Sequence, residues 1–168
     1  MIFYFRNYSI FITKKNMSAI LSQFKAVRHN LLQVLDQFSE KDLSIIPQGF
    51  SNNLYWNIAH CVATQQLLVY YLSGNEMIVE KFWIDNYKKG TSASSKVSDN
   101  NKQKLLDIFH LTTEQFEIDF NSKKFLKYNS YTTSFGLSLN TPDEAISFNT
   151  MHESLHFGYC LAMRKLIL

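Results

Sequence analysis

The sequence predicts an all-α protein, and more specifically an antiparallel four-helix bundle with long crossover loops and a short extended segment before the last helix. Its 168 residues include only 2 prolines and 5 glycines, too few turn-forming residues for a protein of many strands. Hydrophobic residues make up 46% of the chain, which excludes a disordered protein. Several long stretches repeat apolar residues with the helical period of about 3.6 residues. We therefore expect long helices around one core.

We assign residues 17–168 to a single helical domain and residues 1–16 to an N-terminal extension outside the fold. The extension is aromatic and apolar, but Arg6 interrupts it. Lys14 and Lys15 follow its apolar part, whereas a signal peptide carries its positive charges first. Because Met17 precedes the first clean helical pattern, we hypothesise that it is the biological start. A peptide from residues 1–16 in a mass spectrum of the native protein would contradict this.

The first helix is expected to begin at Ser18, which can serve as its N-cap. Its apolar residues follow one face: Ile20, Phe24, Val27, Leu31, Val34, Leu35 and Phe38. A connecting segment over residues 39–49 then contains the helix breakers Pro47 and Gly49.

The second helix is expected from about Asn53 to Leu72, where Ser73-Gly74 is a typical helix end. This helix is apolar on two sides, which indicates that more than one neighbour covers it. His60 lies on one of these sides together with Trp56, so its side chain is expected to point into the protein.

The middle of the chain is less regular. Residues 76–84 can form a short helix, and the polar, serine-rich residues 85–101 are expected to form the longest loop. A third helix is predicted from about Ser98 to Asn121. Residues 125–140 are rich in β-branched and aromatic side chains without a helical period, which favours an extended segment or a short hairpin.

The last helix has a well-defined start. Thr141 is the expected N-cap, Pro142 occupies the first helical position, and Glu144 completes a capping box. The face expected to point inward carries Ala145, Phe148, Asn149, His152, His156, Tyr159, Met163 and Leu166. His152 and His156 are therefore predicted to face the interior of the bundle.

The pair of histidines in the motif H-E-S-L-H is the strongest indication of function. Residues spaced i, i+4 project from one side of a helix, so a single metal ion can bind both His152 and His156. The motif also matches the H-E-x-x-H pattern of zinc peptidases, in which the glutamate, here Glu153, is the general base. The peptidase hypothesis is disfavoured because residues 157–168 contain no histidine or carboxylate to serve as third ligand.

A third ligand must then come from upstream, and His60 is the candidate with the right predicted burial. His29 and His110 lie off the apolar faces and are expected at the surface. Three imidazoles leave a coordination position open, as in catalytic sites. A metal at such a site can activate a water molecule or a thiol.

Other candidate site residues follow from their helical positions. Glu153 is a candidate catalytic base or ligand-supporting residue, with an ordinary surface glutamate as the alternative. Asn149 and Tyr159 share the face of the histidines, and with Trp56 they are candidates for the pocket or for support of the ligands.

Charge and cysteine content limit the partners. The net charge of +3 is spread along the chain rather than concentrated on one face, which disfavours nucleic-acid binding. No apolar run approaches the ~20 residues that a membrane span needs. Cys61 and Cys160 are expected to be core residues, and two thiols without a disulfide framework favour a reducing compartment, the cytoplasm.

The order and spacing of these motifs resemble the DinB/YfiT-like superfamily over residues 17–168. The resemblance rests on residues 56–60 (W-N-I-A-H), 72–74 (L-S-G), 151–158 (M-H-E-S-L-H-F-G) and 161–166 (L-A-M-R-K-L). It implies a four-helix bundle, often a homodimer, with a metal site formed by His60, His152 and His156. It further implies nickel, zinc or a related divalent ion. Members of the superfamily include thiol-dependent S-transferases, a mycothiol-dependent isomerase and proteins described as metal-dependent hydrolases.

Two hypotheses of function follow. In the first, the protein is a metal-dependent enzyme that activates water or a low-molecular-weight thiol against a small substrate. In the second, it is a metal-binding structural or sensory protein without turnover. A metal position open to a pocket would favour the first hypothesis, and a metal capped by a fourth side chain would favour the second.

Overall fold

The computed structural model describes residues 14–93 and 101–167 and confirms the all-α prediction. The described part is mostly helical, with one small antiparallel sheet. Its elements are α1 (Lys14–Gln37), α2 (Glu40–Leu43), α3 (Leu54–Gln65), the π-helix η1 (Gln66–Tyr71), α4 (Lys81–Tyr87), α5 (Asn101–Asn121), β1 (Tyr131–Thr132), β2 (Ser138–Leu139) and α6 (Pro142–Ile167). No helix in the described ranges is long and apolar enough to cross a membrane.

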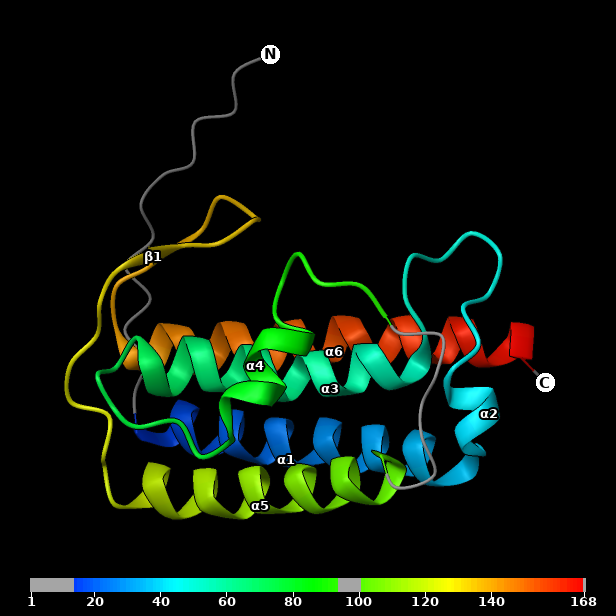
Figure 1. Ribbon diagram of the computed structural model, residues 1–168. Coiled ribbons are helices and arrows are strands. Elements are labelled where there is room, and N and C mark those ends of the chain that lie inside the picture. The colour runs from blue at the N-terminus through cyan, green and yellow to red at the C-terminus, as the bar shows by residue number, and fades with distance from the viewer. Residues whose placement is uncertain (1–13, 94–100, 168) are drawn as a thin grey trace.

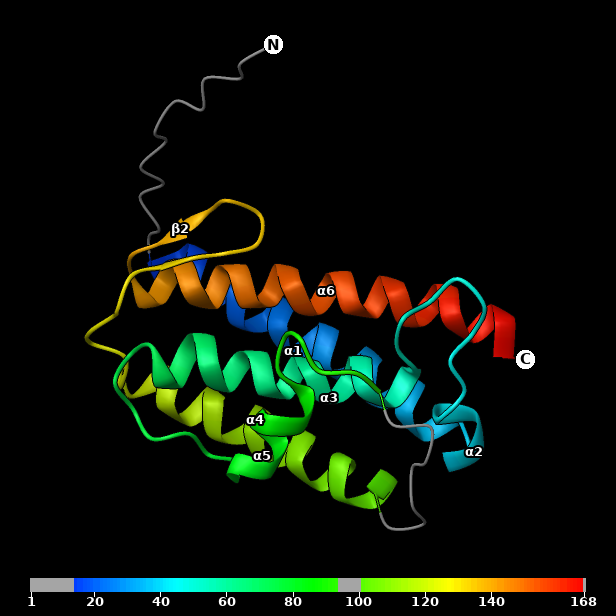
Figure 2. The ribbon, with the colours of Figure 1, turned by 45° about the horizontal axis from the view of Figure 1, so that its top comes forward.

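The long helices α1, α3, α5 and α6 lie lengthwise beside one another (Figures 1 and 2). In both views α1 and α6 run in one direction, and α3 and α5 run in the other. Helix α6 packs against α1 and α3. Helix α5 also packs against α1 and α3. The short helix α4 packs on α3. The apolar core forms two clusters, one toward α4 and the other toward the hairpin β1–β2.

The start of the first helix differs from the prediction. Helix α1 begins at Lys14 rather than Ser18, so residues 14–16, predicted as part of an extension, belong to its first turn. Met17 packs against the apolar core, which explains why the helix continues upstream of Ser18. The other residues of the predicted extension, 1–13, lie outside the described ranges.

The predicted connection over residues 39–49 contains a further short helix, α2. Ser39 caps α2 by accepting a hydrogen bond from the Asp42 amide at 3.2 Å, and the fully buried Leu43 anchors it to the core. A four-residue helix is too short to show a period in the sequence, so the apolar pattern did not reveal it.

The second predicted helix begins where expected, because the Asn53 side chain accepts a hydrogen bond from the Trp56 amide at 2.8 Å. The last part of this helix winds as the π-helix η1, which the sequence did not predict. Within η1, the buried Gln66 accepts a hydrogen bond from the Ile78 amide at 2.6 Å and so ties the helix to the next segment. The chain then turns at Gly74, whose φ of +70° favours glycine.

The short helix predicted over 76–84 is displaced to Lys81–Tyr87, so the polar loop begins later than expected. The predicted start of the third helix at Ser98 lies outside the described residues, and α5 is described from Asn101. The segment 125–140 contains the expected hairpin, in which Tyr131 pairs with Leu139 and Thr132 with Ser138.

The capping box of α6 is confirmed. The Thr141 hydroxyl accepts a hydrogen bond from the Glu144 amide, and the Glu144 carboxylate accepts one from the Thr141 amide, both at 3.2 Å. Reciprocal bonds of this kind satisfy backbone donors that the helix itself leaves unpaired. The start of the helix that carries His152 and His156 is thereby fixed.

A buried ion pair links α1 to α6. The Arg28 guanidinium donates from Nε to Glu153 Oε2 at 2.6 Å and from Nη2 to Oε1 at 2.7 Å, and both side chains have essentially no exposed surface. Arg28 also donates to Thr112 Oγ1 of α5 at 3.0 Å, and Asn149 donates to Glu153 Oε1 at 3.0 Å. The rings of two phenylalanines lie against the guanidinium: Phe24 and Phe109.

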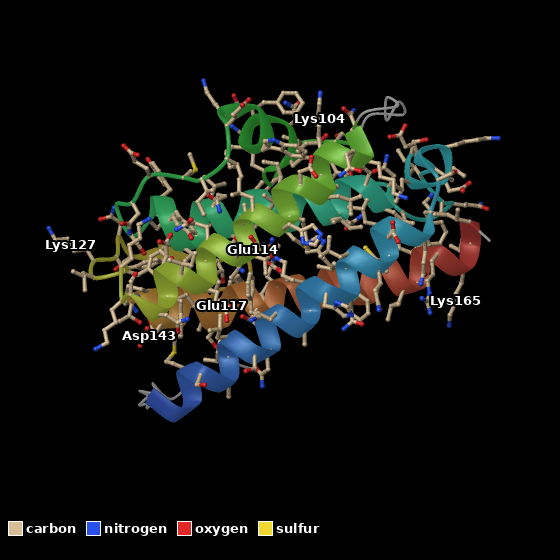
Figure 3. All side chains as sticks on the ribbon, turned by 90° about the horizontal axis from the view of Figure 1, so that it is seen from below. Lys104, Glu114, Glu117, Lys127, Asp143 and Lys165 are labelled. Atoms are coloured by element: carbon tan, nitrogen blue, oxygen red, sulfur yellow. The ribbon has the colours of Figure 1, made fainter. Side chains whose placement is uncertain are left out.

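A second ion pair between helices lies at the surface. Lys25 of α1 contacts the carboxylate of Glu117 of α5 at 2.7 Å, and Glu117 is labelled in Figure 3. Both side chains are partly exposed, so this pair is expected to contribute less than about 1 kcal/mol to stability. It provides a matched control for the buried pair.

We predict that Arg28→Met lowers the free energy of unfolding by roughly 3–5 kcal/mol, because it leaves the Glu153 charge buried without a partner. The double variant Arg28→Met/Glu153→Leu should recover a large part of this loss. Lys25→Met, which breaks the surface pair, should cost about 1 kcal/mol or less. Urea unfolding measures the free energy of unfolding of all three variants. An Arg28→Met variant as stable as Lys25→Met would contradict the buried ion pair.

Candidate metal centre

Three predicted site residues, His60 of α3 and His152 and His156 of α6, come together between the two helices. Each offers a ring nitrogen, and these nitrogens all lie within 4.8 Å of one another. The Nε2 atoms of His152 and His156 are 3.2 Å apart. His60 is 6% exposed, and the other two are half-buried. The three histidines are therefore positioned to bind one metal ion.

Hydrogen bonds hold the Nδ1 atoms of two of the rings, those of His60 and His156. His60 Nδ1 lies 2.5 Å from the Tyr87 carbonyl, which can only accept, so this nitrogen carries a proton and donates. His156 Nδ1 donates in the same way to Asn57 Oδ1 at 2.9 Å. The Asn57 amide is oriented by its own bond from Nδ2 to the Asn53 carbonyl at 2.8 Å. The Nε2 atoms of His60 and His156 are thus unprotonated, and each has a free lone pair with which it can bind a metal.

His152 lacks such support. Its Nδ1 atom is buried and has no hydrogen-bond partner among the described residues. Its Nε2 atom lies beside the lone pair of His156 Nε2 and donates to it when no cation is bound. A cation bound between the two Nε2 atoms would replace this contact between the imidazoles, whereas His152 Nδ1 would keep no partner among the described residues.

The surroundings keep all three rings neutral at neutral pH. Burial lowers the pKa of His60 below its usual value, although the bond to the Tyr87 carbonyl opposes the shift. Burial, followed by the charges that His156 and His60 would carry, lowers the pKa of His152 to about 3. Burial and the nearby His60 lower that of His156 to about 4. Neutral imidazole is the form that coordinates a metal ion.

Aromatic stacking and the segment after α4 hold the His60 ring in place. The Trp56 indole stacks on the His60 ring with centroids 4.6 Å apart and planes inclined by 10°. Trp56 in turn donates from Nε1 to Thr91 Oγ1 at 3.1 Å, four residues beyond the Tyr87 carbonyl. Thr64, one turn after His60 on α3, lies 3.2 Å from His60 Nε2.

The geometry fits a small divalent ion. Tetrahedral zinc with bonds to nitrogen of about 2.0–2.1 Å places two ligand nitrogens roughly 3.3 Å apart. The two Nε2 atoms of His152 and His156 are already at 3.2 Å. A set of three neutral imidazoles suits zinc, nickel and related transition ions rather than magnesium or calcium, which prefer oxygen ligands.

A cavity of about 440 Å³ reaches all three histidines. Its walls come from α3, η1, α6 and the hairpin segment, and they are mostly apolar. The hairpin segment contributes Tyr131, Thr133, Ser134 and Phe135 to these walls. One lysine, Lys89, also lines this cavity.

A second cavity of about 820 Å³ lies between α6 and the segment that joins α2 to α3. Trp56 and Tyr159 line this second cavity rather than the one that reaches all three histidines. His156 and Leu155 line both cavities, so the two cavities adjoin at His156. Of the predicted pocket residues, Trp56 and Tyr159 therefore line the second cavity, and Asn149 lines neither of the two.

The structure does not bring Glu153 or Asn149 to the histidines. Glu153 is fully buried, binds Arg28 and Asn149 with its carboxylate, and lines neither cavity. Its burial contradicts the surface alternative considered from the sequence, and its carboxylate is directed to Arg28 of α1 rather than to the histidines. Asn149 supports Glu153 and not a histidine. His29 and His110 are exposed and separate from the centre, as predicted.

The two cysteines are free, buried core residues, as predicted. Burial raises the pKa of the Cys160 thiol to about 12 and that of Cys61 well above its usual value. Both thiols are therefore protonated at neutral pH, and neither joins the three histidines in the described part of the chain.

Sequence reasoning missed the residues that orient the histidines. The Tyr87 carbonyl is a backbone group in a segment far from His60 in the sequence, so no side-chain pattern could have revealed it. Asn57 carried a signal, because it lies three residues before His60 and so on the same face of one helix. Its partner, however, is on another helix.

Comparisons with known proteins agree with this fold. Residues 23–160 match the family model described as the DinB superfamily. The crystal structure of a conserved protein from Enterococcus faecalis is similar to this one, with a TM-score of 0.67, 11% sequence identity, and coverage of 90% of this chain and 96% of that chain. This likeness concerns the fold alone. A comparison with curated proteins finds no match. Because the family model covers most of its length, the chain belongs to the DinB superfamily.

Proposed function

We propose that this protein is a metal-dependent enzyme in which His60, His152 and His156 hold one divalent ion, zinc or nickel. The observation that carries the proposal is the set of three neutral imidazoles at ligand spacing beside a cavity large enough for a small substrate. When bound, such an ion lowers the pKa of a water molecule or a low-molecular-weight thiol and so supplies a nucleophile at neutral pH. The reaction is then a hydrolysis or a thiol transfer on a small molecule.

The chain's own residues prepare the site for this chemistry. The Tyr87 carbonyl and the Asn57 amide fix the tautomers of His60 and His156, so their lone pairs need no rearrangement. Trp56 covers one face of the His60 ring and keeps water from it. The apolar walls formed by Leu67, Leu68 and Phe148 lower the local dielectric constant, which strengthens electrostatic interactions with the substrate.

The alternative, a structural or sensory metal-binding protein without turnover, calls for a fourth protein ligand that closes the site. In the described part of the chain, no cysteine or carboxylate joins the three histidines. Thr64 is the side chain near His60 Nε2, and a neutral hydroxyl is a weak ligand compared with a thiolate or a carboxylate. This composition favours an open position and hence the enzyme.

We also infer that α1, α3 continued by η1, α5 and α6 are the four helices of an antiparallel bundle. The packing of α6 on α1 and α3, together with the opposite directions of α3 and α6, supports this classification. The short helices α2 and α4 and the hairpin are then additions within the crossover connections.

A homodimer in the cytoplasm completes the proposal. Helix α6 exposes an apolar stripe at i, i+4 spacing, in which Met151 is 46%, Leu155 45% and Tyr159 51% exposed. A second copy of the chain would cover this stripe, and light scattering of the purified protein tests it: a monomer at micromolar concentration would contradict the dimer. The free, buried thiols of Cys61 and Cys160 are consistent with a reducing compartment.

We predict that the purified protein, after removal of metal with a chelator and incubation with zinc, retains one ion per chain. His60→Ala, His152→Ala and His156→Ala should each lose this stoichiometric binding, because two imidazoles hold zinc much more weakly than three. The measurement is elemental analysis after gel filtration. His29→Ala and His110→Ala are matched controls and should bind as the wild type does. Full occupancy in His60→Ala, or no bound metal in the wild type, would refute the three-ligand site.

We further predict that Asn57→Leu weakens zinc binding by roughly 10–100-fold, because His156 loses the acceptor that fixes its tautomer. Asn57→Asp keeps an acceptor at the same place and should bind zinc at least as tightly as the wild type. Competition with a coloured chelator measures both affinities, and circular dichroism checks that both variants fold. Equal zinc affinities in the two variants would show that Asn57 does not orient His156.

A further inference from the structure

We infer that the cavity at the histidines takes a small anionic ligand with an apolar body, whose carboxylate or similar anion pairs with Lys89. This inference names a substrate class and rests on the proposed function, in which the reacting end of the ligand lies at the three histidines. The Lys89 contact itself, however, can be tested without any metal.

The first observation is the balance of charge in the cavity. Lys89 is the one permanently charged side chain among the described residues that line it, and none of these residues is acidic. A divalent ion held by the three histidines would add positive charge, and no carboxylate among the described residues that line the cavity would balance it. An anionic ligand is the group that would compensate this charge in an apolar setting.

The second observation is that the Lys89 side chain has no partner among the described residues. No hydrogen bond or ion pair joins its ammonium group to another residue in the described part of the chain. Its neighbour Lys88, by contrast, lies 3.3 Å from the Asp85 carboxylate and does not line the cavity. The two adjacent lysines therefore have different roles, and Lys88 provides a matched control.

The third observation is that a tight turn places the backbone of Lys89 beside the cavity, with its side chain exposed. The Thr91 amide donates to the Lys88 carbonyl at 3.2 Å, which closes a tight turn with Lys89 and Gly90 at its corners. Gly90 has a φ of +91°, as the third position of a type II turn requires. The same segment carries the Tyr87 carbonyl that orients His60. The position of Lys89 is thus coupled to that of the histidine site.

The rest of the wall fits the apolar body of such a ligand. Leu67, Leu68 and Leu72 come from the end of the second long helix, and Phe135 and Phe148 lie on the hairpin segment and α6. The volume of about 440 Å³ falls within the range of pockets that bind small molecules. A ligand with its anion at Lys89 and its apolar part on this wall would reach the histidines with its other end.

The test compares hexanoate with hexanamide, which differ in charge but hardly in shape, by calorimetric titration of metal-free and zinc-loaded protein. The metal-free wild type should bind hexanoate roughly tenfold more tightly than hexanamide, as a charge-assisted hydrogen bond provides. It should also bind hexanoate more tightly than butyrate, by about fourfold per methylene group. Lys89→Met, which removes the ammonium group but keeps an unbranched side chain, should remove the preference for the acid, while Lys88→Met should retain it.

Several results would overturn the inference. Equal binding of the acid and the amide to the wild type, no binding of either, or an undiminished preference in Lys89→Met would each do so. A preference that appears only with zinc and survives in Lys89→Met would assign anion recognition to the ion instead. The zinc stoichiometry of Lys89→Met should match the wild type, so loss of the metal site in the histidine variants and loss of anion pairing remain separate outcomes.

Discussion

The bidentate contact between Arg28 and Glu153 is the interaction on which the arrangement of this protein depends. It is buried between α1 and α6, where neither charge has access to water. Removing two charges from water is costly, and the cost is offset here by two short hydrogen bonds, the Thr112 and Asn149 contacts, and the aromatic rings against the guanidinium. Because the carboxylate must meet Arg28, the rotation of α6 about its axis is fixed.

That rotation also sets the metal site. Successive residues on a helix are about 100° apart, so His152 and Glu153 cannot face the same neighbour. With Glu153 directed to α1, His152 and His156 are directed to α3, where His60 completes the cluster. The motif H-E-S-L-H thus contributes to two groups of residues on adjacent faces of one helix: Glu153 to the ion pair, and His152 and His156 to the histidine cluster. The glutamate of this motif is part of the ion pair, which further disfavours the peptidase hypothesis.

The sequence was sufficient for most of the fold and for the three histidines that are positioned to bind a metal ion. The helical periods, the capping box at Thr141 and the hairpin segment all lie in local patterns that a single sequence displays. The spacing of His152 and His156 was equally local, and burial identified His60. The role of Glu153 was not accessible in this way, because it depends on Arg28, which lies 125 positions away on another helix. The same holds for the Tyr87 carbonyl and for the π-helical turn of η1, which depend on tertiary contacts.

The central claim is that three imidazoles and no other protein group coordinate the ion. X-ray absorption spectroscopy of the zinc-loaded protein tests it most directly, because the fine structure counts imidazole ligands and distinguishes sulfur from nitrogen or oxygen. The account predicts three imidazoles at about 2.0–2.1 Å, completed by light-atom ligands from solvent. A sulfur ligand, or fewer than three imidazoles, would contradict it.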